Sequence, residues 1–447
     1  MIKGLIKYKD FFFSGHERSI KAKKNILSLF FIKGYSVFIS FALIPLTLEL
    51  LNDYKYGVWI TVFNFLSMLQ IFDIGIGNGL RNKLAEALAL NEIRNAREYV
   101  STSYVVMAVL ALLLIIFFLI PWYYIEWFRV FNTGIDIEAE LKILIGVCYI
   151  ITVLQFFLNL MNSILTAYHK PAFPSFIFAI SNTIILFIFI LFKSLINESL
   201  VLIGLIYTIV PLILFLIFSF WVFNTKYKEI RPSILFYNKA KVKDLFSLGG
   251  SFFIIQFAGL VIFQTDALII SHTLSPEEVT PYSIVYKYFS ITIMLTTIIL
   301  TPLWSAYTEA YAKNDFKWIK NIINKQLKGL LLIMVIIALM LLFSKPIIKL
   351  WVNKEMELSW ILLIGTAIFS VVSVWNNIFA MFLNGLSKTK TQIKTSIVGL
   401  IINIPLSILL AKSYGAGGVI IGTIISLLFF AVFGAIETFS ILKKQTL

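Results

Sequence analysis

The chain has 447 residues, of which 59% are hydrophobic and 14% charged, and its formal net charge is +15. A soluble domain carries about 25% charged residues, so this composition excludes an ordinary soluble protein and indicates a chain solvated by lipid. A single cysteine, Cys148, excludes an intramolecular disulfide, and the three histidines are too far apart in the sequence to indicate a metal site.

Twelve apolar segments follow one another along the chain, and most reach the length of about 20 residues that a bilayer span requires. Because lipid offers the backbone no hydrogen-bond partners, we expect these spans to be helices. The sequence therefore predicts an all-α integral membrane protein with about twelve transmembrane helices. The predicted spans are residues 25–48, 56–78, 99–121, 141–167, 172–192, 200–223, 245–271, 281–304, 326–344, 358–384, 391–411 and 416–438.

Lysine and arginine are concentrated in alternate loops, with 28 on one side of the predicted membrane and eight on the other. The positive-inside rule places the basic loops and both termini in the cytoplasm of a bacterial inner membrane, which an even number of spans permits. The opposite loops are acidic, as at Glu126, Asp136 and Glu138. The positive net charge is therefore explained by membrane topology, with some attraction to anionic membrane lipids. We do not expect nucleic acid as a partner.

Two short patterns recur about half a chain apart. Residues 56–59 resemble 282–285, and residues 85–92 resemble 308–315. Six spans separate the equivalent points, so both halves have the same orientation, which predicts two six-helix bundles related by an axis along the membrane normal. The expected organisation is a cytoplasmic segment at 1–24, a bundle at 25–223, a basic cytoplasmic linker at 224–244 and a second bundle at 245–447.

Three patches in order along the chain resemble a known family. They are Tyr56-Gly57-Val58-Trp59 with Phe72 to Arg81, Thr265 to Ser271, and Ser413 to Thr423. Together with the twelve spans, they are similar to the Wzx-type O-antigen and capsule flippases. That family shares a superfamily and a MATE-like transporter fold with multidrug/cation antiporters and peptidoglycan lipid flippases. One departure is Ala267, where family members often carry a basic residue.

The resemblance implies that the chain moves an undecaprenyl-diphosphate-linked oligosaccharide from the cytoplasmic to the outer leaflet. A polysaccharide polymerase and other assembly proteins are then expected partners. The apolar tail of such a substrate can stay in lipid. Its diphosphate and hydroxyl groups need a polar and preferably cationic cavity, because bare ions in hydrocarbon cost on the order of tens of kcal/mol.

Two lysines, Lys33 and Lys287, fall inside predicted spans, where a charge costs about 2.5–3.5 kcal/mol. We expect both to face the central cavity and bind the diphosphate, with snorkelling to the interface as the alternative for Lys33. Arg81, at the cytoplasmic entrance, either meets the incoming diphosphate or contacts lipid headgroups. Asn159 and Asn162 share a helix face and either bind sugar hydroxyls or join helices.

Two aspartates, Asp266 and Asp73, lie within spans and are candidates for binding H⁺ or Na⁺, which would couple transport to an ion gradient. A structural helix contact is the alternative for each, and no other cofactor or metal is expected. The aromatic residues Trp122 and Trp351 are interpreted as parts of interfacial belts.

Three alternatives remain open. A multidrug/cation antiporter of the same fold would favour an acidic cavity, and Lys33 argues against it. A peptidoglycan lipid flippase often has additional spans and more cavity arginine. A membrane glycosyltransferase or polymerase needs a catalytic loop, whereas the longest predicted loops have only about twenty residues. We therefore expect a transporter and not an enzyme.

Overall fold

The computed structural model of the chain describes residues 17–69, 75–168, 170, 172–196, 198–247, 250–312, 314–386 and 388–444. These residues form long helices and short helical turns, without a strand among them. Eleven helices are long and apolar enough to cross a membrane. The predicted all-α membrane fold is confirmed.

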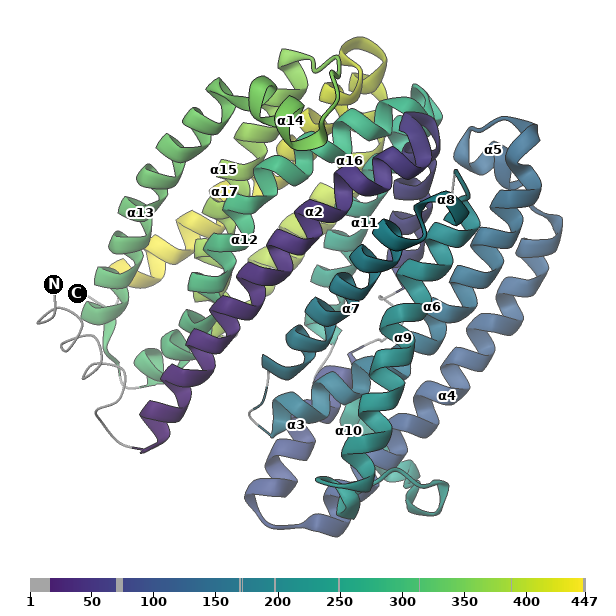
Figure 1. Cartoon of the computed structure of the whole chain (residues 1–447). Helices are drawn as coiled ribbons and strands as arrows, with labels where there is room; N and C mark the ends of the chain where they lie inside the picture. Colours follow the sequence, from purple (N-terminus) through teal and green to yellow (C-terminus); the bar gives the residue numbers. More distant parts are fainter. Residues whose placement is uncertain are drawn as a thin grey trace, which may run out of the picture.

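The first long helix, α2 (Glu17–Ser67), contains more than one crossing. Its helical geometry breaks at Asn52, where φ is 62° and ψ is 174°. In Figure 1 the purple ribbon of α2 rises and then folds back. The first arm contains the predicted span 25–48, whereas the second arm begins the predicted span 56–78, which continues into α3 (Ile76–Ala89). The eleven apolar helices therefore accommodate the twelve predicted crossings.

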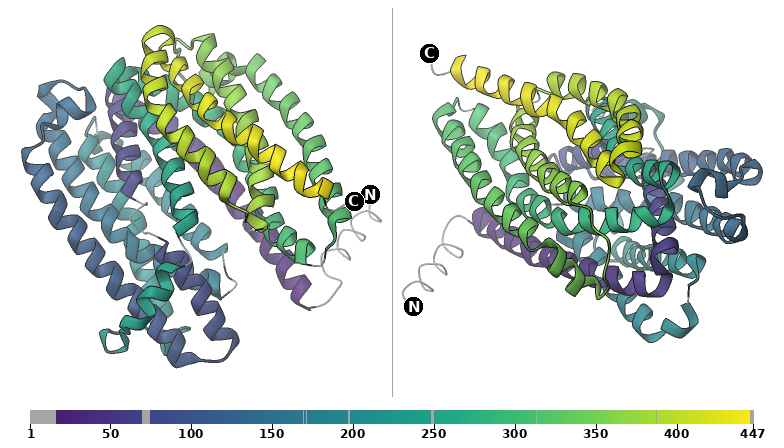
Figure 2. Two further views of the ribbon diagram at one scale, coloured as in Figure 1. Left: turned by 180° about the vertical axis from the view of Figure 1, so that it is seen from behind. Right: turned by 90° about the horizontal axis from the view of Figure 1, so that it is seen from above.

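The other helices follow in two groups, as Figures 1 and 2 show. The first group continues with α4 (Ile93–Tyr124), α5 (Trp127–Phe131), η2 (Ile135–Ile137), α6 (Glu138–Ala167), α7 (Ala172–Leu191), α8 (Lys193–Ile196) and α9 (Leu200–Asn224). The linker contains η3 (Lys228–Ile230), η4 (Ile234–Phe236) and α10 (Lys239–Ser247). The second group is α11 (Gly250–Thr273), α12 (Pro276–Ala312), α13 (Phe316–Leu342), α14 (Ser344–Val352), α15 (Trp360–Gly385), α16 (Lys390–Tyr414) and α17 (Ala416–Lys444).

The segment 79–98, between two predicted spans, is helical except for a turn at 90–92, because α3 and α4 extend beyond the predicted spans. Its charged residues pair along the helices: Lys83 lies 2.9 Å from Glu86, and Arg94 lies 3.5 Å from Glu98. Pairs at these spacings stabilise exposed helical turns. The charges therefore mark where the lipid ends, while the helices continue beyond it.

The turn after α3 and the turn after α12 have the same geometry, which supports the predicted duplication. Asn91 and Asn314 occupy aligned positions, and both have a left-handed backbone, with φ of 58° and 55°. In each copy the next residue donates its backbone N–H to the aligned alanine carbonyl, at 2.9 Å for Ala87 and 2.8 Å for Ala310. Asparagine tolerates this conformation better than most residues do.

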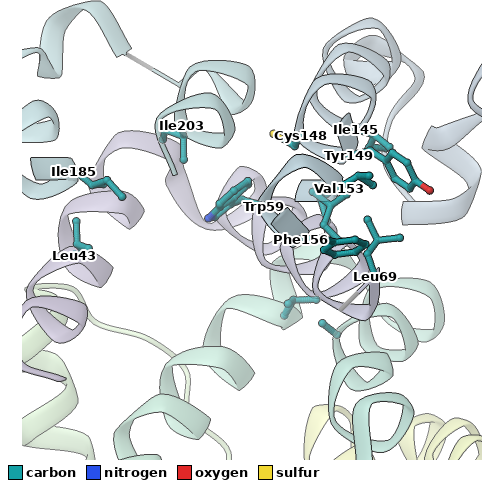
Figure 3. Close-up of a cluster of buried hydrophobic side chains, with 14 of the residues drawn as sticks. Leu43, Trp59, Leu69, Ile145, Cys148, Tyr149, Val153, Phe156, Ile185 and Ile203 are labelled. Atoms are coloured by element: carbon teal, nitrogen blue, oxygen red, sulfur yellow. The ribbon is translucent and has the colours of Figure 1, made fainter. Parts of the chain in front are cut away.

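The core of the first bundle lies where both arms of α2 meet α6, α7 and α9. Trp59, on the second arm, stacks on Tyr207 of α9 with ring centroids 5.4 Å apart. Figure 3 shows Trp59 between Leu43 and the side chains of α6, among them the buried Cys148. This packing fixes both arms of α2 within the first bundle.

The two ends of the bundles differ in charge pairing. We call the end with the loops at 125–137 and 353–359 the acidic side, and the end with the linker the basic side. Of the eight lysines and arginines predicted for the acidic side, five form ion pairs in the described part of the chain: Lys55, Arg129, Lys193, Lys349 and Lys354. The linker's cations form no ion pair among the described residues. The electrostatic potential is therefore more positive on the basic side.

Candidate substrate path and coupling site

The two bundles touch closely at their acidic ends, where the second arm of α2 meets the start of α12. The Thr280 hydroxyl donates to the Asp53 carbonyl at 2.6 Å, and the Lys354 ammonium lies 2.7 Å from the Asp53 carboxylate. A Cβ atom placed on Gly57 would lie 1.8 Å from the Pro276 carbonyl oxygen. The backbones are thus in direct contact, and only glycine fits at this position.

Two short helices, α5 and α14, close the same side from opposite bundles, and each ends at a left-handed asparagine. Beyond α5, the Asn132 amide donates to the Ser271 carbonyl at 2.7 Å, and the Ser271 hydroxyl donates to the Phe131 carbonyl at 2.5 Å. From α14, the Trp351 indole donates to the Phe41 carbonyl at 2.9 Å. Each short helix therefore holds the first long helix of the opposite bundle. Trp351, interpreted from the sequence as a belt residue, belongs to this closure.

Exposure changes along the helices that meet between the bundles. On the first arm of α2, Phe31, Tyr35 and Phe38 are exposed towards the basic side, whereas Leu43 and Leu48 are buried towards the acidic side. The change repeats on α11, where Gln256 and Phe257 are exposed and residues 269–271 are buried. The tight packing between bundles is therefore concentrated towards the acidic side.

Lys287 lies on α12 where that helix meets α2 of the other bundle. Its ammonium is 5.6 Å from the centre of the Phe41 ring, which packs 4.8 Å from the Trp351 ring. The lysine is half-buried, and the described residues place no carboxylate within ion-pair distance of it. Lys33 is also half-buried and precedes Phe41 by about 12 Å along the same arm. The predicted location of both lysines within spans agrees with the structure, while their role stays a prediction.

The remaining predicted substrate residues are more dispersed. Arg81 is exposed on α3. Asn159 is exposed and Asn162 half-buried on α6, and the Asn162 amide nitrogen lies 3.5 Å from the Asn159 amide oxygen, as expected for one helix face. No hydrogen bond or ion pair joins these three residues to Lys287 in the regions that the structure covers. Asp73 lies outside the described residues.

Asp266, on α11, is the centre of a buried polar cluster. It is only 2% exposed. The Tyr282 hydroxyl donates to one carboxylate oxygen at 2.6 Å, and the Thr423 hydroxyl lies 3.2 Å from both oxygens. The Asn403 amide donates to the Thr423 oxygen at 3.3 Å. Three helices of the second bundle, α11, α12 and α17, therefore meet at this carboxyl group, and α16 is joined to it through Thr423.

The cluster supplies hydroxyl donors, and among the described residues no lysine or arginine lies within 4.0 Å of Asp266. The buried Asn403 side-chain oxygen has no hydrogen-bond partner within the described chain. An ionised carboxylate buried without a counterion is strongly disfavoured. The cluster is therefore suited to hold a proton on the carboxyl group, or a small cation between it and neighbouring oxygens.

A family model that covers most of the chain identifies its family. Residues 22–308 match the family model described as "Polysaccharide biosynthesis protein", which is more than half of the chain. The chain belongs to the polysaccharide biosynthesis protein family. Residues 252–409 also match the MatE family model.

Similar proteins agree with the family and the fold. A relative from Yersinia pseudotuberculosis, named "Putative O-antigen export protein", is 25% identical over 409 residues, covering 88% of this chain and 90% of the relative. An inward-facing structure of a multidrug resistance MATE transporter has a TM-score of 0.77, at 13% identity, and covers 94% of this chain and 99% of the other. An outward-facing structure has a TM-score of 0.67, at 15% identity, and covers 95% and 96%. This family member therefore has the predicted MATE-like fold.

Proposed function

We propose that this polysaccharide biosynthesis protein flips an undecaprenyl-diphosphate-linked oligosaccharide from the cytoplasmic to the outer leaflet, for O-antigen, capsule or exopolysaccharide assembly. The family match and the relative named for O-antigen export support a polysaccharide substrate. The observation that carries the proposal is the half-buried Lys287, which lies between two bundles that meet on one side. A cation there suits an anionic headgroup and disfavours a cationic drug.

The orientation of the proposal rests on charge. The segments predicted to lie on the basic side carry 28 of the lysines and arginines, whereas five of the eight predicted for the acidic side form ion pairs. The positive-inside rule then makes the basic side cytoplasmic, in a bacterial inner membrane, with both termini inside. In this proposal the acidic-side contacts form the closed outer gate, and substrate is loaded from the cytoplasm.

We propose that transport proceeds by alternating access, which the position of the contacts between the bundles supports. Opening the outer side requires Thr280, Lys354 and Trp351 to leave their partners on the first bundle, while the linker helix α10 stays packed on α3. Lys287 is near these contacts, so a bound diphosphate would be positioned at the region that must rearrange. Arg81 and Lys33, nearer the basic side, would meet the headgroup earlier, while the lipid tail remains in the bilayer.

We further propose that Asp266 couples this cycle to an H⁺ or Na⁺ gradient. The buried carboxyl group connects α11 and α12, the helices that carry Ser271 and Lys287 at the seam between bundles. Protonation or cation binding at Asp266 changes the charge that these helices enclose, which gives the ion a differential affinity for the two states. One charge crossing 100 mV is worth about 2.3 kcal/mol.

Asp266→Asn is expected to keep the hydrogen bonds with the hydroxyl groups but to remove ion coupling. Uptake of lipid-linked oligosaccharide into inverted vesicles should lose its response to imposed pH and Na⁺ gradients. A gradient of 100 mV should otherwise change the distribution about fifty-fold. Asp136→Asn, an exposed carboxylate on the acidic side, is the matched control and should respond normally. An unchanged gradient response in Asp266→Asn would remove Asp266 from the coupling mechanism.

The proposed function is tested by deleting the gene and measuring surface glycan together with undecaprenyl-linked intermediates. Loss of surface polysaccharide with accumulation of the lipid-linked unit in the cytoplasmic leaflet is the expected result. Unchanged glycan with altered sensitivity to cationic drugs would contradict the proposal and favour the antiporter alternative, which the MatE match to the second half also fits.

A further inference from the structure

The linker between the bundles carries an apolar tip that packing leaves uncovered. Ile234 and Leu235, in η4, are 77% and 87% exposed. Next to them, Phe236 is covered by the Arg97 guanidinium, 3.9 Å from its ring centre. Exposing two adjacent aliphatic side chains to water is unfavourable. Their exposure therefore indicates that they contact something other than water.

The tip is held in place on α4 and is not a loose connection. The Ser233 backbone N–H donates to the Ser101 hydroxyl at 3.1 Å, and the Asn238 backbone N–H donates to the Thr102 hydroxyl at 3.1 Å. The Arg97 side chain donates to the Arg231 carbonyl at 3.1 Å. These bonds fix the segment on both sides of η4, so the apolar tip has a defined depth relative to α4.

That depth corresponds to the edge of the bilayer. The exposed apolar face of α4 extends from Val109 to Tyr124, and a hydrocarbon core of about 30 Å would require about 20 helical residues. Counted back from Tyr124, the basic-side edge of the hydrocarbon core falls near Tyr104. Tyr104 is only about 5 Å along the helix from Ser101. The headgroup layer on each side of the core is about 5–8 Å thick, so η4 lies within it. Figure 1 shows the linker loop beside the basic end of α4.

Cations lie on both sides of the tip along the chain. Four basic residues of the linker on either side of η4 are exposed: Lys228, Arg231, Lys239 and Lys243. The acidic residues of the same stretch are Glu229 and Asp244. On α9, Lys226 lies 5.2 Å from the ring of the half-exposed Trp221. An aromatic ring with a cation at its edge is typical of a membrane interface, and clustered lysine and arginine attract anionic headgroups.

We propose that η4 is a membrane anchor, in which Ile234 and Leu235 insert into the basic-side leaflet while the flanking lysines and arginine bind anionic lipid headgroups. The anchor would attach the rim of the first bundle to that leaflet while the second bundle moves. The proposal does not depend on which substrate is transported.

The test places a polarity-sensitive fluorophore on Leu235→Cys in a Cys148→Ser background, in the full chain in nanodiscs containing brominated lipid. Leu90→Cys is the matched control, because Leu90 is 63% exposed but precedes the start of α4 at Ile93, which is about 12 Å along the helix from Ser101. We expect at least about twofold stronger lipid quenching at 235 than at 90, increasing with the fraction of anionic lipid.

A Lys239→Glu and Lys243→Glu double variant should lose the dependence on anionic lipid while its probe at 235 stays more quenched than the control. Equal quenching at 235 and 90 in every lipid mixture would overturn the anchor. Protection of position 235 from labelling in cells, combined with equal quenching in nanodiscs, would assign the tip to a protein partner and would also overturn it.

Discussion

Gly57→Val is expected to disfavour closure of the acidic side and to reduce export strongly. The Cβ of any larger residue would lie 1.8 Å from the Pro276 carbonyl oxygen, a backbone atom that cannot move aside alone. Overpacking of this kind costs about 1–3 kcal/mol, which corresponds to a change of about 5- to 150-fold in the population of the closed state. The measurement is surface glycan in a strain that depends on this gene, at matched protein level.

A second readout separates a conformational effect from misfolding. Ser271, buried in the acidic-side contact, is replaced by cysteine in a Cys148→Ser background and labelled with a membrane-impermeant thiol reagent. Labelling should increase when Gly57→Val is added. Gly34→Val, on the other arm of α2, is the control, because its Cβ meets nothing within 4 Å. Normal export by a well-expressed Gly57→Val protein would show that this contact is not part of the gate.

Lys287→Gln is expected to reduce export about 10- to 150-fold, because a charge-assisted hydrogen bond to the diphosphate is worth about 1.5–3 kcal/mol. Lys287→Arg retains the positive charge and should keep a substantial part of the activity. The measurement is the initial rate of glycan export at equal protein level. Lys33→Gln should reduce export in the same direction.

Two controls distinguish substrate binding from packing. Phe41→Leu removes the ring beside Lys287 but keeps the ammonium, so it should be milder than Lys287→Gln. Lys345 is an exposed lysine on the acidic side, and its ammonium lies 4.8 Å from the centre of the Trp360 ring. Lys345→Gln removes this contact and should leave export unchanged. If Phe41→Leu and Lys287→Gln were equally harmful, the lysine would be a packing partner of the ring.

Much of the fold could be predicted from the sequence because lipid imposes one requirement repeatedly. The length of each apolar run and the side of each basic loop depend on local composition, so the twelve crossings follow directly. The duplication could be predicted because residues 85–92 resemble residues 308–315, and the aligned Asn91 and Asn314 have the same left-handed backbone. The helical extent of residues 79–98 was not predicted, because charges such as Lys83 and Glu86, which pair along a helix, mark only where the apolar spans end.

The site could be predicted only in part, because its contacts join distant segments. Asp266 was identifiable as a carboxyl group within a span. Its partners Tyr282, Asn403 and Thr423 carry no signal as single polar residues, and the hydrogen bond from Thr423 joins positions 157 residues apart. Likewise, the sequence located Lys287 within a span but did not indicate that it meets Phe41 of the other bundle.

The most direct test of the central claim uses the purified protein in proteoliposomes that contain an undecaprenyl-diphosphate-linked oligosaccharide in both leaflets. A glycosidase added outside removes the sugar that faces it, with Na⁺ and pH equal on the two sides. The proposed function predicts that cleavage proceeds beyond the outward-facing pool at a rate that depends on the protein and falls in Lys287→Gln. Cleavage that stops at the outward-facing pool, as in protein-free liposomes, would contradict it.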